Sequence, residues 1–153
     1  MKRHYIIHLF VIFLLLGTGV FTFSHNIMAE CSPYALKRTN SFGFIWGKVT
    51  IEGLGDVPVG AEIRAYVDEE DICYGSFKIN KQGFYGAMTI YMDDPTTPEK
   101  DGVKNGDILN FKICLDNTEY NCNETYRWNS SNINNQIQLD LTGKDIVSDA
   151  PEQ

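Results

Sequence analysis

The sequence predicts an all-β domain built from short antiparallel strands. Between residues 42 and 141, apolar and polar residues alternate with a period of two, the pattern of a strand with one face in a core. Turn-forming residues interrupt this alternation frequently, as they do in domains made of two packed sheets. No window of this region shows a convincing helical spacing of apolar residues. These observations together favour two antiparallel sheets packed face to face.

The strand pattern occurs in about seven stretches of the chain. They are residues 45–51, 63–67, 73–79, 84–90, 109–115, 120–128 and 137–141. In the third and fourth, alternation places the following residues on the inner face: Cys73, Gly75, Phe77 and Ile79, then Phe84, Gly86, Met88 and Ile90. The expected fold is an antiparallel β-sandwich of about seven strands, Ig-like or transthyretin-like, over residues 30–142. A disordered acidic tail is expected over residues 143–153.

Turn signals separate these strands in chain order. Gly and Pro end the first strand over residues 53–60, and an acidic turn over residues 69–71 follows the second. Residues 80–83 read as a hairpin-like connection between the third and fourth strands. A long acidic loop precedes the fifth strand, and a polar turn over residues 130–135 precedes the last.

The first 29 residues carry the pattern of an export signal. Lys2 and Arg3 form a short basic segment, a nearly unbroken apolar run covers residues 6–23, and Ala29 offers a small residue for cleavage. We expect cleavage after Ala29 and a secreted, cell-surface or periplasmic protein with no membrane insertion. The alternative is an uncleaved anchor, because the apolar run approaches the length that spans a bilayer.

The charge of the mature chain excludes several classes of function. Removing Lys2 and Arg3 from the 13 basic residues leaves 11 against 20 acidic ones, a formal net charge of −9. Nucleic acids and anionic membrane surfaces are therefore disfavoured partners, since both attract basic faces. The three histidines, His4, His8 and His25, all precede residue 30, so the mature chain lacks the commonest general base. We expect a protein that is not an enzyme.

Four cysteines remain in the mature chain, and an even number in an exported protein favours disulfides. Three pairings are possible. Cys114 and Cys122 have the spacing of a hairpin and could face each other, and Cys31 with Cys73 would then tie the N-terminus to the domain. Alternation places Cys114 opposite the core set of its strand, whereas Cys122 shares a face with Trp128. A buried Trp128 therefore needs a bulge or a different pairing.

The acidic loop over residues 92–107 is a candidate ion site. Calcium prefers six to eight oxygen ligands, which this loop could supply from its backbone carbonyls and from Asp93, Asp94, Asp101, Asn105 and Asp107. The spacing is not that of an EF-hand. The alternative is that Asp, Asn and Gly form turns and that the aspartates accept hydrogen bonds from their own backbone.

Aromatic residues are the candidates for binding a larger partner. Strand alternation turns several tyrosines and tryptophans outward, and we expect Tyr91, Tyr126 and Trp128 to be ligand-binding residues. Aromatic side chains of this kind contact a surface protein or stack on a glycan. The alternative is that they are ordinary strand residues, since strands favour aromatics.

Several short motifs together resemble one recurring module. They are Gly47-x-Val49-Thr50-Ile51, Val57-Pro58-Val59-Gly60, Gly83-x-Tyr85-Gly86, Asp93-Asp94-Pro95 and Asp101-Gly102 followed by Gly106-Asp107-x-Leu109-x-Phe111. The pattern is similar to β-sandwich repeats of exported bacterial and archaeal surface proteins, which resemble carboxypeptidase-regulatory and collagen-adhesin B-type domains. The resemblance implies a non-catalytic binding or structural module for protein adhesion or scaffolding. A carbohydrate-binding module is the alternative.

Overall fold

The computed structural model describes residues 30–67, 72–129 and 136–145, and it confirms an all-β fold for them. The strands are β1 (Ala35–Leu36), β2 (Ser41–Ile51), β3 (Gly55–Asp56), β4 (Glu62–Val67), β5 (Ile72–Lys78), β6 (Phe84–Met92), β7 (Ile108–Leu115), β8 (Thr118–Arg127), β9 (Gln136–Gln138) and β10 (Leu141–Asp145). The predicted export signal, two of the predicted turns and the end of the predicted tail lie outside the described residues.

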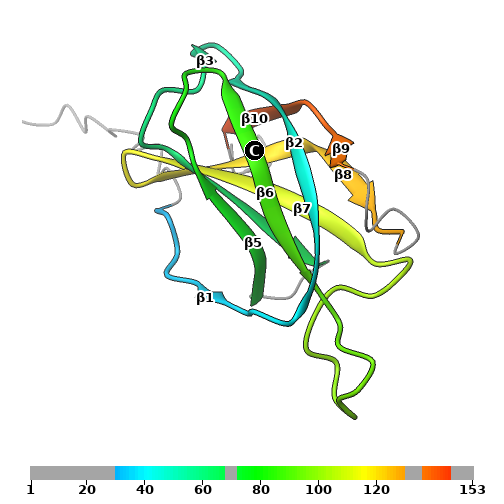
Figure 1. The fold of residues 1–153 in the computed structure, drawn as a ribbon. Helices are drawn as coiled ribbons and strands as arrows, with labels where there is room; N and C mark the ends of the chain where they lie inside the picture. Colours follow the sequence, from blue (N-terminus) through cyan, green and yellow to red (C-terminus); the bar gives the residue numbers. More distant parts are fainter. Residues whose placement is uncertain (1–29, 68–71, 130–135, 146–153) are drawn as a thin grey trace, which may run out of the picture.

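These strands form one mixed sheet instead of the purely antiparallel arrangement that was expected (Figure 1). The order is β1-β5-β4-β7-β8-β10-β2-β3, with β6 and β9 also paired to β2. Three pairs are parallel: β1 with β5, β10 with β2, and β9 with β2. Alternation within a strand reports which face is buried but not the direction of its neighbour, so the sequence pattern missed this feature.

The C-terminal strand of the prediction is divided into β9 and β10. β9 pairs with the first half of β2 and β10 with its second half, and Leu139 and Asp140 lie between them. β10 then continues to Asp145, so residues 143–145, which were predicted as part of the tail, form a strand. The long strand β2 therefore connects both parts of the sheet.

The sheet curls so that its inner face encloses a single core. Fully buried side chains come from β2, β4, β5, β6, β7 and β10 and from residues next to strands, and the largest are Trp128, Tyr74, Tyr85, Phe111, Ile45, Ile63, Ile79, Met88, Ile90, Leu109, Ile113 and Leu141. Each aliphatic side chain of this kind contributes about 1.5–3 kcal/mol when it leaves water. β5 and β6 also meet closely, because a Cβ on Gly75 would lie 2.6 Å from the Thr89 carbonyl oxygen.

Two irregularities reverse the faces that alternation predicted. Ala65 pairs with Gly75 but Tyr66 pairs with Cys73, so Tyr74 is an extra residue in β5 and Cys73 lies beside Tyr66. In β6, Ile45 pairs with Met88 whereas Gly47 pairs with Tyr85, which leaves two residues opposite one. A β-bulge of this kind shifts the phase of alternation. Phe84 and Gly86 are therefore exposed, and Tyr85 is buried instead.

The disulfide joins Cys31 to Cys114, with 5.7 Å between their Cα atoms. Of the pairings left open by the sequence, the one that hairpin spacing allowed, Cys114–Cys122 with Cys31–Cys73, does not form, because Cys73 and Cys122 are free thiols. Cys114 pairs with Glu119 in the β7–β8 ladder, whereas Cys122 packs against the core from further along β8. Cys122 is not part of the disulfide and lies on the inner side of β8. Trp128, directly after β8, lies on the same side and is buried.

Candidate binding surface

An exposed row of aromatic side chains runs along the outer side of β2. Gly43, Ile45 and Gly47 are buried on the inner side, so Phe42, Phe44 and Trp46 point outward by alternation. Phe42 is 44% exposed and Trp46 is 37% exposed. Both values are high for large apolar residues in a strand with a complete core behind it.

The neighbouring strand β6 extends this row. Tyr91 is the cross-strand partner of Phe42, and Phe84 is the partner of Lys48. Phe84 is 41% exposed, and the Lys81 ammonium lies 4.5 Å from the centre of its ring. We call the set of Phe42, Phe44, Trp46, Phe84 and Tyr91 the aromatic face. It belongs to one ladder, so its residues keep fixed positions relative to each other.

The geometry of the aromatic face suits irregular apolar groups better than a flat ligand. The rings of Phe42 and Phe44 have centroids 5.6 Å apart and are inclined at 66°, an edge-to-face arrangement. These two inclined rings do not form one level platform for stacking. Phenylalanine side chains also offer no hydrogen-bond donor or acceptor.

The aromatic face contains one of the three predicted ligand residues. Tyr91 lies in it and is half-buried. Trp128 is only 1% exposed, so it cannot receive a ligand, and it belongs to the core. Tyr126 is half-buried and contacts Trp128 edge to face, with ring centroids 6.1 Å apart. Tyr126 and Trp128 are two residues apart, so they share one face of the chain, and that face packs against the core.

The other members of the aromatic face, Phe42, Phe44, Trp46 and Phe84, were not among the predicted ligand-binding residues. The available signal was the alternation Phe42-Gly43-Phe44-Ile45-Trp46-Gly47, in which aromatics alternate with small or aliphatic residues. Its aromatics fall on the side opposite to Ile45. Phe84 carried no such signal, because the β6 bulge places it on the outer side.

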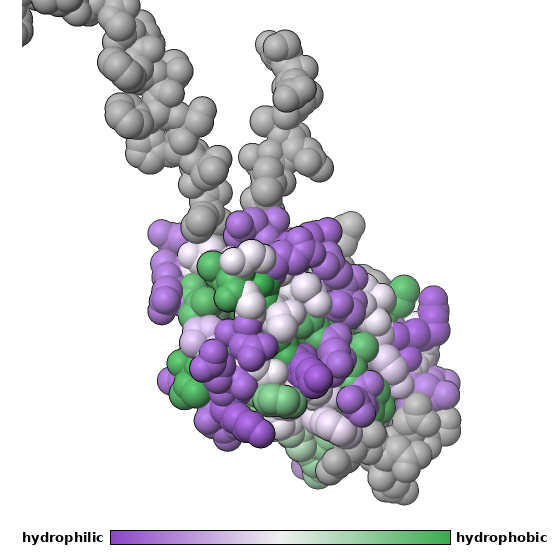
Figure 2. Space-filling view, turned by 90° about the horizontal axis from the view of Figure 1, so that it is seen from above, coloured by the Kyte–Doolittle hydropathy of each residue, from purple (hydrophilic) through white to green (hydrophobic). Residues whose placement is uncertain are grey.

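The molecule also exposes apolar side chains away from the aromatic face. Figure 2 shows the domain from above the view of Figure 1, with apolar patches separated by polar residues. Leu54 and Val59 are the most exposed large apolar residues described, at 64% and 63%. Both lie in turns, where single exposed apolar residues are common. They do not form a strand row like the one on β2.

The predicted calcium ligands in the acidic loop accept hydrogen bonds from the loop itself. The Asp101 amide donates to Asp93 Oδ1 at 2.9 Å, and the Asp94 amide donates to Asp101 Oδ1 at 2.9 Å. Asp94 Oδ1 accepts from both the amide and the hydroxyl of Thr96. These are Asx-type contacts of a self-stabilised turn, the alternative interpretation of the sequence.

The second part of the loop carries ion pairs. The Lys104 amide donates to Asp107 Oδ2 at 2.9 Å, and Lys100 Nζ lies 3.2 Å from the same oxygen. Lys104 Nζ lies 3.4 Å from Asp93 Oδ2. Asn105, the remaining predicted ligand, lies in the turn between Lys104 and Asp107. Within the part of the chain that the structure describes, no three carboxylate, cysteine or histidine groups are arranged to hold a metal ion.

The loop contacts favour the charged form of two aspartates. Partial desolvation raises the pKa of Asp93, but hydrogen bonding from the Asp101 amide and the charge of Lys104 outweigh it and lower that pKa from its ordinary value. The hydrogen bonds from Thr96 lower the pKa of Asp94 in the same way. Each carboxylate is ionised at neutral pH and is already paired with donors.

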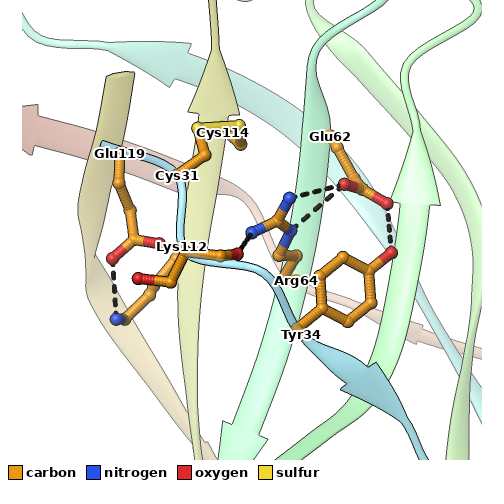
Figure 3. Close-up of a disulfide and its surroundings, with 8 residues drawn as sticks. Cys31, Tyr34, Glu62, Arg64, Lys112, Cys114 and Glu119 are labelled. Carbon is orange, nitrogen blue, oxygen red and sulfur yellow. Dashed lines mark hydrogen bonds and ion pairs between the residues drawn. A yellow bond between two sulfur atoms is a disulfide. The ribbon is translucent and has the colours of Figure 1, made fainter. Parts of the chain in front are cut away.

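A second polar cluster lies on the outer side of β4, β7 and β8, beside the disulfide (Figure 3). Arg64 is 7% exposed, and its guanidinium donates to Glu62 Oε2 at 2.9 Å and to the Ser32 carbonyl at 2.8 Å. Lys112 Nζ lies 2.7 Å from Glu119 Oε1, and Glu119 is also buried. The N-terminal segment before β1 covers this cluster.

Comparisons with known proteins give little guidance. No protein-family model and no curated protein matches the chain. One solved structure, an alternative pilotin from the type II secretion system of Vibrio cholerae, is similar at a TM-score of 0.43 and 11% identity, covering 69% of this chain and 98% of that one. This likeness is too slight to bear on function. No helix of a length and apolarity suited to crossing a membrane occurs in the described residues.

Proposed function

We propose that this protein is an exported, non-catalytic β-domain that binds another protein through its aromatic face. The observation that carries the proposal is the ordered row of aromatic side chains on β2 and β6, in which Phe42, Trp46 and Phe84 are the most exposed. Aromatic residues are enriched in the central parts of protein interfaces. Their rigid side chains lose little conformational entropy when a partner covers them.

The aromatic face is not needed to complete the core. Ile45 and Val49 on the inner side of β2 are fully buried, and the buried cluster is continuous without Phe42, Phe44 or Trp46. Polar residues at these positions would serve folding equally well, since strand alternation requires only one apolar face. A row of large apolar residues on the outer side therefore favours a role in contact with a partner.

The disulfide supports export. Disulfides persist in oxidising compartments and are rare in the reducing cytosol. With the export pattern of residues 1–29, this supports a secreted, cell-surface or periplasmic location. We also propose that the domain is related to Ig-like sandwiches of the collagen-adhesin B type. That relationship would imply a role in adhesion or scaffolding.

A site-specific crosslinking experiment tests the proposal. A photo-crosslinking amino acid at position 46, in the protein expressed in its host, should give one discrete adduct with another protein. The same group at position 78, an exposed site on β5, is the matched control and should not give that adduct. Phe42→Ala should weaken the adduct from position 46 without changing the folded state.

Two outcomes would contradict the proposal. Adducts that are equal at positions 46 and 78 would show that contact is unspecific. Failure of position 46 to crosslink, combined with a glycan-array signal that Trp46→Ala abolishes, would favour the carbohydrate-binding alternative. Sugar binding usually needs aromatic rings that present an open face, so Trp46 is the residue that separates the two cases.

A further inference from the structure

The segment formed by residues 31–37 crosses the outer side of the sheet as a strap. Figure 3 shows it running from Cys31 past Arg64 to Tyr34, in front of β7 and β4. One end is held by the Cys31–Cys114 disulfide and by the Cys31 amide, which donates to the Asn117 carbonyl at 3.1 Å. The other end is held by the two residues of β1 and by the Lys37 amide, which donates to the Cys73 carbonyl at 3.0 Å.

Between its two ends the strap contacts Arg64. The Ser32 carbonyl accepts a hydrogen bond from Arg64, and the Tyr34 ring lies 4.2 Å from the guanidinium carbon. The Tyr34 hydroxyl donates to Glu62, which also pairs with Arg64. These contacts explain how a charged side chain on the outer side of β4 becomes almost fully buried. Without the strap, Arg64 and Glu62 would be open to water.

A free thiol is buried beside the same contacts. Cys73 has no exposed surface, and its Sγ lies 3.0 Å from the Gly75 carbonyl oxygen. The bulge at Tyr74 turns Cys73 to the outer side, where it pairs with Tyr66 across the ladder and with Leu36 of β1. Its electrostatic neighbours include Arg64 and Glu62, and burial raises its pKa. The thiol is therefore protonated and shielded while the strap is in place.

We propose that the strap is a redox latch in which the Cys31–Cys114 disulfide holds it closed over Cys73 and Arg64. A dithiol reductant would transfer two electrons to the disulfide, so that Cys31 and Cys114 become thiols and the reductant becomes a disulfide. The remaining anchors are the two-residue ladder of β1, the backbone hydrogen bonds of the Cys31 and Lys37 amides, a bridge between Glu30 and Thr118, and the side-chain contacts with Arg64 and Glu62. Short, exposed ladders of this kind open locally at low cost in free energy. The strap then lifts, and the Cys73 thiol becomes accessible.

Thiol labelling measures the latch directly. In the mature Cys122→Ser protein, Cys73 is the free thiol that remains beside the Cys31–Cys114 disulfide. We expect a maleimide to label Cys73 slowly in this protein. In the Cys31→Ser/Cys114→Ser/Cys122→Ser protein, labelling should be faster by about tenfold or more, since the rate follows the population of the open state.

A matched control separates local opening from global unfolding. Val49→Ala, in the Cys122→Ser background, lowers global stability through the core but leaves the disulfide intact. The Cys73 labelling rates of this variant and of the disulfide-free variant are compared at denaturant concentrations that give the two proteins the same free energy of unfolding. The latch would be overturned if Cys73 were labelled equally fast in the Val49→Ala protein and in the protein without the disulfide. It would also be overturned if removing the disulfide did not accelerate labelling.

Hydrogen exchange provides a second test that does not depend on the variants folding. Reduction of the native protein should remove the protection of the Cys31 and Lys37 amides, which anchor the strap. The Val49 and Ile79 amides, which donate to Gly83 and Ala61 in the body of the domain, should stay protected. Loss of protection at all four amides together would mean global unfolding and would reject the latch.

Discussion

Gly43 lies directly against the ring of Trp128. A Cβ built on Gly43 would come within 2.8 Å of Trp128 Cη2 and 2.9 Å of Cζ2. Trp128 is fully buried, so its ring has no room to move away. This contact joins β2 to the segment after β8, and it explains why a glycine occupies the inner side of β2 between the outward Phe42 and Phe44.

Gly43→Ala should therefore destabilise the fold by overpacking. We expect a loss of about 1–3 kcal/mol in the free energy of unfolding, measured by urea denaturation. Trp128→Phe in the same chain should restore part of this loss, because a smaller ring relieves the clash. Phe also lacks the indole N–H, which has no hydrogen-bond partner among the residues that the structure describes. Additive effects of the two substitutions would contradict direct contact.

The two tryptophans should respond oppositely to substitution. Trp128→Ala should cost about 3–5 kcal/mol of stability, because it leaves a large cavity in the core. Trp46→Ala removes a side chain on the outer face and should change stability by less than about 1 kcal/mol. Thermal unfolding followed by circular dichroism measures both. A large loss for Trp46→Ala would assign the aromatic face a structural role instead of a binding one.

The Cys31–Cys114 disulfide should contribute measurably to stability. It closes a loop with a sequence separation of 83 residues, for which the entropy model predicts about 2–5 kcal/mol. Urea denaturation of the Cys31→Ser/Cys114→Ser protein against the parent tests this value. Alkylation of the denatured, unreduced protein followed by peptide mapping checks the pairing. Alkyl groups should appear only on the free thiols Cys73 and Cys122. Alkyl groups on Cys31 or Cys114 would contradict the pairing.

Calcium should have little effect on the acidic loop. The carboxylates of Asp93, Asp94 and Asp101 already accept hydrogen bonds from the loop, and a cation would have to displace those donors. We expect millimolar calcium to leave the melting temperature unchanged. Magnesium at the same ionic strength is the control for screening. A selective rise with calcium that Asp101→Asn abolishes would instead support an ion site.

The same loop should lose its contacts on acidification. The pKa of Asp93 is lowered from its ordinary value in the folded protein, so ionised Asp93 stabilises the loop above the pKa of an unfolded aspartate, about 4. That contribution disappears as pH falls through the lower, folded-state pKa. The Asp101 amide, which donates to Asp93, should report this transition in an NMR titration. In Asp93→Asn the transition should be absent; an unchanged titration would show that another group is responsible.

The fold class could be predicted because side-chain alternation repeats over most of the domain. Ile63, Ala65 and Val67 are buried as their spacing predicts. Alternation failed at Cys73 and Phe84, where a single bulge in each strand reverses the face of the residues that precede it. A bulge is decided by the register between two strands, which local sequence does not specify.

The candidate site was predicted less well for the same reason. Tyr91 was selected and lies in the aromatic face, whereas Trp128 was selected and is buried. An aromatic residue in a strand has equal prior reason to face inward or outward, and only its neighbours decide between them. The disulfide was missed because its partners are brought together by the strap, far apart in the chain.

By itself, the sequence determined that this chain forms strands with one apolar face, that its loop aspartates suit tight turns, and that it carries an export pattern. These properties depend on residue type and on spacings of a few residues. The tertiary structure decided that Cys31 meets Cys114, that Cys73 is buried beside Arg64, and that Phe42, Trp46 and Tyr91 share one surface. Those relationships depend on register, bulges and chain return, which arise only when distant segments pack together.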